Sequence, residues 1–108
     1  MNPRVMYVVR IRVPLKLERE WNEWHDKEHI PMVLEQPGFM EVRKFRKIAA
    51  NSDEAEYFLM YELRNQTAYE QYANSDEGAR LRQHYLDAWG SKTTITRWAW
   101  QQTFQLKK

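Results

Sequence analysis

The residues whose types and spacing could carry out chemistry gather in one segment, W-N-E-W-H-D-K-E-H-I-P, which begins at Trp21. His25 and His29 lie one helical turn apart in it. At about 100° per residue, Glu28 falls between Trp21 and Trp24, so we expect its carboxylate to face the core. A buried carboxylate needs a cation or a histidine as partner, or its pKa rises. A buried carboxylate next to two imidazoles is typical of a site for general acid and base catalysis, and this is the function that the segment predicts.

Two other interpretations of this segment stay open. Pro31 interrupts a helix and frees backbone amides, so Glu28 could be a structural cap, with His25 and His29 as boundary residues bonded to the backbone. A zinc site would need a third ligand. His84 is the only other histidine, and the order H-D-K-E-H differs from the zincin motif H-E-x-x-H. We therefore expect no metal site.

The spacing of apolar residues along the chain predicts the strands and helices that surround this segment. Apolar residues alternate in four stretches and recur at helical spacing in two. The expected elements are a strand over 5–13, a helix from Leu17 to the Gln36-Pro37-Gly38 turn, strands over 39–48 and 57–63 joined by a turn at 51–53, a helix over 65–89, and a strand over 93–106. Pro31 predicts a kink, or two helical pieces meeting near His29. Asn65 and Ser75 are the expected N-caps.

This order predicts an α+β, ferredoxin-like βαββαβ fold, in which a four-stranded antiparallel sheet carries both helices on one face. The other face also holds apolar residues that need a cover. We expect it to carry Val8, Val42, Met60 and Trp98. A second copy packed sheet to sheet would cover them, which predicts a homodimer.

Composition narrows the class of protein. The chain has 108 residues, enough for a single domain over 1–108, and 43% of them are hydrophobic. Lys and Arg number 17 and Asp and Glu 15, interspersed along the chain, so neither nucleic acid nor a membrane is an expected partner. With no cysteine, thiolate chemistry is excluded, and a cytoplasmic location is expected. Fourteen per cent aromatic residues favour a small hydrophobic or aromatic ligand.

The motif W-N-E-W-H-D-K-E-H-I-P, with the later P-G-F and R-K-F-R, resembles the dimeric α+β barrel superfamily, in particular its EthD-like and small antibiotic-biosynthesis-monooxygenase-like members. Trp24, Glu28, His29 and Pro31 match the pattern. That superfamily includes cofactor-free monooxygenases, haem-degrading oxygenases, muconolactone isomerases, polyketide cyclases and proteins without known activity. The resemblance thus implies the fold and leaves the reaction open.

Together these observations predict a small cofactor-independent enzyme, of monooxygenase, isomerase or cyclase type, that acts on an aromatic, polyketide-like or lactone substrate. Glu28 or His29 would be the base, and Arg43 or His84 would stabilise an oxyanion. The alternative is a non-catalytic accessory protein that binds a small hydrophobic molecule. The expected catalytic residues are Glu28, His29 and His25. The expected substrate-binding residues are Trp21, Trp24, Tyr7, Arg43, Tyr61, His84, Tyr85 and Trp89.

Overall fold

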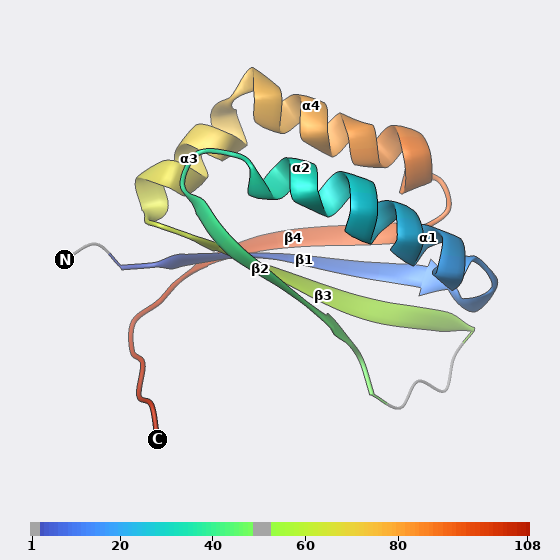
Figure 1. The fold of residues 1–108 in the computed structure, drawn as a ribbon, viewed down its shortest axis with the longest axis horizontal. Helices are drawn as coiled ribbons and strands as arrows, with labels where there is room; N and C mark the ends of the chain where they lie inside the picture. Colours follow the sequence, from blue (N-terminus) through green and yellow to red (C-terminus); the bar gives the residue numbers. More distant parts are fainter. Residues whose placement is uncertain (1–2, 49–52) are drawn as a thin grey trace.

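Alternating apolar residues build four strands that form one antiparallel sheet in the order β2-β3-β1-β4. The computed structural model describes residues 3–48 and 53–108. Its strands are β1 (Val5–Pro14), β2 (Phe39–Arg46), β3 (Glu54–Leu63) and β4 (Thr94–Gln101). The helices all lie on one face of the sheet (Figure 1). The predicted ferredoxin-like βαββαβ fold is confirmed.

The helical layer consists of two segments, each subdivided. The first contains a 3₁₀ turn η1 (Leu15–Leu17), α1 (Glu18–Trp24), a π-helical turn η2 (His25–His29) and α2 (Ile30–Leu34). The second contains α3 (Gln66–Asn74), α4 (Asp76–Tyr85) and a π-helical turn η3 (Leu86–Gly90). None of the described helices is long and apolar enough to cross a membrane.

Both predicted N-caps are confirmed. The Asn65 side chain accepts a hydrogen bond from Ala68 N at 2.9 Å, and the Ser75 hydroxyl accepts one from Gly78 N at 2.9 Å. Ser75 has φ −85° and ψ 153°, an extended conformation that separates α3 from α4. The second helical segment is therefore two helices that meet at a capping serine.

The first helical segment divides in the region where Pro31 predicted a discontinuity. Ile30 N–H bonds to His25 O, five residues back, and so closes a π-helical turn between α1 and α2. Pro31 lies at the start of α2, where its missing N–H is tolerated best. The prediction of two helical pieces meeting near His29 is confirmed, and the wide turn η2 joins them.

Several predicted strand ends differ from the structure; β2, for example, ends at Arg46 instead of Ile48. β4 ends at Gln101 instead of Leu106, because Gln101 pairs with Val5, the first residue of β1. β3 begins at Glu54, ahead of the expected Tyr57. Residues 51 and 52 of the expected turn lie outside the described residues.

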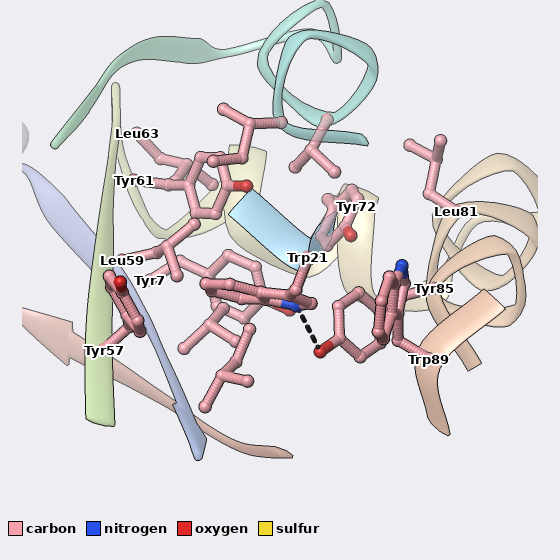
Figure 2. Packing of buried hydrophobic residues seen from close by; sticks show 14 of the residues in the cluster. Tyr7, Trp21, Tyr57, Leu59, Tyr61, Leu63, Tyr72, Leu81, Tyr85 and Trp89 are labelled. Carbon is pink, nitrogen blue, oxygen red and sulfur yellow. Dashed lines mark hydrogen bonds between the residues drawn. The ribbon is translucent and has the colours of Figure 1, made fainter. Parts of the chain in front are cut away.

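The core fills the space between the sheet and the helical layer. Figure 2 shows its aromatic part, in which Trp21 Nε1 donates to the Tyr85 hydroxyl at 3.0 Å. Tyr85 bonds in turn to Thr93 Oγ1 at 2.8 Å, and Thr93 donates to Trp89 O at 2.8 Å. This chain of bonds satisfies the polar atoms that the large aromatic side chains carry into the core.

The outer face of the sheet, away from the helices, holds an apolar centre. Val8 pairs there with Met60 on one side and Trp98 on the other. Val42 is an exception to the expectation, because it pairs with Tyr61 and packs against the core on the helix side. A bulge between Phe39 and Glu41 shifts the register of β2, which explains the change of face.

Candidate active site

A small cavity lies between the sheet and the helical layer. Its volume is about 20 Å³, which is room for about one water molecule. Its walls come from β1, β3, β4, η2, α2, α3 and α4. The lining residues are Tyr7, Val9, Ile11, His25, His29, Val33, Leu59, Tyr61, Tyr72, Arg82, Tyr85, Ile95 and Arg97. Two imidazoles and two guanidinium groups thus meet in an otherwise mostly aromatic and aliphatic space.

His25 is held by its neighbours in one orientation. It is 1% exposed and stacks on Trp21 with a centroid separation of 4.4 Å. Lys44 Nζ lies 3.2 Å from His25 Nδ1 and 2.6 Å from Asp26 Oδ1. An ammonium group only donates, so His25 Nδ1 accepts and the ring proton belongs on Nε2. Burial, reinforced by the charge of Lys44, lowers the pKa of His25 to about 2, so the ring is neutral at pH 7.

His29 lies between two other rings. It stacks on Trp24 at 5.3 Å and on His84 at 5.3 Å between centroids, and it is 7% exposed. Its Nδ1 lies 3.0 Å from His84 Nδ1. Burial lowers the pKa of His29 to about 4, and the nearby charges of His84 and Arg97 act in the same direction. His29 is therefore also neutral at pH 7.

Glu28 completes a row of three ionisable side chains that leads to the surface. Its Oε1 lies 3.6 Å from His84 Nε2. A carboxylate at this position favours a proton on His84 Nε2, which leaves the Nδ1 lone pair of an uncharged His84 to accept from His29. His29 then donates through Nδ1 and keeps a lone pair on Nε2, the form that a general base requires.

The expectation that Glu28 faces the core is wrong, because its side chain is 56% exposed. A wheel with 3.6 residues per turn places Glu28 on the apolar side. In the π-helical turn η2, each residue rotates about the helix axis by a smaller angle than in an α-helix. The buried side chains therefore recur at every fourth position. These buried residues are Trp21, His25, His29 and Val33.

The predicted site residues separate into three groups. Tyr7, His25, His29, Tyr61 and Tyr85 line the cavity as expected. Trp21, Trp24 and Trp89 do not line it. Trp21 and Trp89 belong to the buried core, and Trp24 packs against that core beside His29. His84 lies next to His29 without lining the cavity, and it contacts Glu28.

Arg43 lies on the wrong face for the expected role. It pairs with Met60 on the outer face of the sheet and forms an ion pair with Glu41 at 3.5 Å. The expectation that it reaches the same pocket as His29 is therefore wrong. Alternation along β2 instead directs its neighbour Lys44, which pairs with the core residue Leu59, to the helix side.

Four polar residues near the cavity were missed by the sequence interpretation: Lys44, Tyr72, Arg82 and Arg97. Arg97 pairs with Val9, so it shares the helix-facing side of β4 with Ile95. Arg97 could have been identified from the sequence, because it is a charged residue at a position of the strand that faces the core.

Other known proteins share this fold. An EthD family protein from Bacillus halodurans is 16% identical with a TM-score of 0.65, over 86% of this chain and 95% of the other. A candidate antibiotic biosynthesis monooxygenase from Bacillus cereus is 12% identical with a TM-score of 0.72, over 99% and 100%. SnoaB, a cofactor-independent oxygenase from Streptomyces nogalater, is 15% identical with a TM-score of 0.66, over 99% and 100%.

These similarities define the class by its fold: the chain has a ferredoxin-like α+β fold, and EthD-like and antibiotic-biosynthesis-monooxygenase-like proteins are among its structural neighbours. A comparison with curated protein sequences found no match. Residues 4–102 match the family described as Domain of unknown function (DUF4286), and the chain belongs to that family. At these identities the solved structures establish the fold, so a function must be argued from the site.

Proposed function

We propose that the protein is an enzyme that removes a proton from a carbon of a small organic substrate, with His29 as the general base. The observation that carries the proposal is the row from His29 through His84 to Glu28, because it leaves His29 Nε2 unprotonated. The proton taken by Nε2 is balanced by transfer of the Nδ1 proton to His84. Glu28 stabilises the resulting imidazolium.

Removal of the proton leaves a negative charge on the substrate, and a hydrogen-bond donor is needed to stabilise it. His25 lines the same cavity and carries its proton on Nε2, because Lys44 occupies Nδ1. It is suited to stabilise an enolate oxygen by donating one hydrogen bond. The carbanion then takes its proton back at another carbon, attacks a carbonyl carbon within the substrate, or reacts with molecular oxygen. These outcomes correspond to an isomerase, a cyclase and a cofactor-independent monooxygenase.

The size of the cavity sets a condition on any function that requires a small organic molecule to enter it. Room for about one water molecule is too little for an aromatic substrate. Substrate entry therefore requires the side chains at the rim to move. Arg82, Ile95 and Arg97 are half-buried and would be the ones to do so. A non-catalytic accessory protein that binds a small hydrophobic molecule needs the same opening, so the presence or absence of proton transfer distinguishes the two functions.

Proton exchange distinguishes the two functions without knowledge of the natural product. Compounds with acidic C–H bonds, such as anthrone and small β-diketones, would be incubated with the protein in D₂O, and loss of the C–H signal followed by ¹H NMR. We expect the wild-type protein to accelerate exchange and His29→Asn to lose about 10²-fold or more of that rate. Equal rates for the two proteins, in the presence of demonstrated binding, would favour the accessory protein.

We also propose that two copies of the chain pack through the outer face of the sheet. Phe45 and Trp100 are 50% and 60% exposed on that face, beside the apolar centre at Val8. The C-terminal residues, in which Phe104 is 79% exposed, extend beyond β4 on the side away from the helices (Figure 1). A second copy would cover both features, and the flanking ion pairs of Arg12 with Glu56 could exchange partners across a twofold axis.

A further inference from the structure

Two arginines border the cavity without a carboxylate partner in the described part of the chain. Arg82 from α4 and Arg97 from β4 both line it, and its lining contains neither Asp nor Glu. Arg82 donates to Ala73 O at 3.2 Å and also bonds to the Tyr72 side chain. Within residues 3–48 and 53–108, Arg97 forms no ion pair and no side-chain hydrogen bond. Two guanidinium groups beside one cavity whose lining has no carboxylate form a cationic site, which an anionic group of a ligand would complement.

The tyrosines that share the cavity do not supply that anion. Burial raises the pKa of Tyr7 and the pKa of Tyr72 above the ordinary value, although the charges of Arg82 and Arg97 act in the opposite direction on both. Both hydroxyl groups therefore stay protonated at neutral pH. A protonated phenol can donate a hydrogen bond to an anion; the Tyr7 hydroxyl already donates to Tyr72, so the Tyr72 hydroxyl is the one that adds to the binding capacity of the two arginines.

The histidines add no competing charge. His25 and His29 are neutral at pH 7, and Arg97 is one cause of the lowered pKa of His29. Arg97 therefore lies near enough to influence the ring that we assign as the base. An anion bound by Arg97 would lie close to His29 as well.

We propose that this cavity binds the carboxylate group of a small organic acid, through Arg82 and Arg97 with help from the Tyr72 hydroxyl. The inference rests on the proposed function, which it deepens by naming the substrate class. A carboxylate oxygen takes the place of the single water for which the cavity has room, and the rest of the acid leaves through the rim at Ile95. Because His29 and His25 line the same cavity, an acid that also carries a ketone would place the acidic C–H bond between the two groups near His29 and the ketone oxygen near His25.

The test is binding of matched acids and amides, measured by isothermal titration calorimetry at pH 7 and low salt. The probes are benzoate with benzamide and phenylacetate with phenylacetamide, since each pair differs little in shape and fully in charge. We expect at least one acid to bind about tenfold or more tightly than its amide. Arg97→Gln and Arg82→Gln should each remove that preference, and Arg97→Lys should retain part of it.

Arg80→Gln is the matched control, because Arg80 lies on α4 but is exposed and paired with Glu77 at 2.7 Å. It should bind the acids like the wild-type protein. If a variant at Arg97 does not fold, salt gives the same information: an increase from about 20 to about 200 mM should weaken binding of the acid and leave the amide unchanged.

His29→Asn separates this inference from the proposed function. The variant should still bind the acid but should no longer catalyse proton exchange. A wild-type protein that binds the acid but does not catalyse exchange would overturn the catalytic role and leave the carboxylate site standing. Acids that bind no more tightly than their amides to the wild-type protein, or a preference that survives Arg97→Gln, would overturn the carboxylate site.

Discussion

His29 and His84 face each other through Nδ1 atoms 3.0 Å apart, with the two rings stacked at an interplanar angle of 14°. One ring must donate and the other accept, so the tautomers of the half-buried His84 and the buried His29 are coupled. Because His84 also contacts the exposed Glu28, a change at the surface can alter the proton position inside the cavity. The predictions below follow from this coupling and from the packing around it.

Glu28→Gln should reduce proton exchange by about twofold to tenfold, because the imidazolium formed on His84 loses its carboxylate partner. His29→Asn should have the much larger effect expected for loss of the base. The matched control is Glu23→Gln, since Glu23 is exposed on α1 and pairs with the exposed Lys27. Equal rates for Glu28→Gln and Glu23→Gln would remove Glu28 from the mechanism.

Stability should fall as the pH is lowered below about 6.5. The unfolded chain then binds protons at histidine, whereas His29 and His25 in the folded protein resist protonation down to about pH 4 and about pH 2. The free energy of unfolding therefore rises with pH across this range, by up to about 1.4 kcal/mol per pH unit for each histidine. Urea unfolding at several values between pH 7 and pH 5 measures the slope, and His29→Asn should make it shallower.

Tyr85→Phe should destabilise the protein by about 1–3 kcal/mol, because Trp21 Nε1 would lose its acceptor inside the core (Figure 2). Tyr69→Phe is the control. Tyr69 is half-buried against Tyr7, and its hydroxyl makes no hydrogen bond within the described residues. Urea unfolding of both variants gives the comparison, and similar stabilities would show that the Trp21 bond contributes little.

The proposed dimer predicts that Trp100→Glu and Phe45→Glu will shift the protein to a monomer, since each places a charge on the outer face. Met32→Glu, at an exposed position on α2, changes a similarly apolar side chain on the opposite side of the molecule and should leave the assembly unchanged. Light scattering after size exclusion measures the mass. A wild-type protein that is already monomeric at high concentration would contradict the proposal.

Much of the fold was predictable because it depends on short-range patterns. Alternation in β1 and β3 assigns each side chain to a face, and Asn65 and Ser75 mark helix starts through their own side chains. Two errors have one kind of cause, an irregularity in a regular element. The wide turn η2 moves Glu28 outward, and the bulge in β2 moves Val42 inward. Pro31 signals a discontinuity near η2 but not the direction in which it turns Glu28, and the bulge in β2 has no clear signal in one sequence.

Only the part of the site whose residues are close in sequence could be predicted. His25 and His29 were identified because they are close in sequence, and four residues apart they remain on one side even of a π-helical turn. Arg82 and Arg97 reach the cavity from α4 and β4, which only the tertiary fold brings together. Arg43 was chosen over Lys44 because, without the register of β2, the inward-facing member of that basic pair was not apparent.

The central claim, that His29 is a neutral base with a free Nε2, is tested most directly by ¹⁵N NMR of the three imidazole rings as the pH is varied. The account predicts that at pH 7 His29 is protonated on Nδ1 alone and His25 on Nε2 alone, and that His29 gains its second proton only near pH 4. A His29 that is protonated on Nε2 at pH 7, or doubly protonated there, would contradict it.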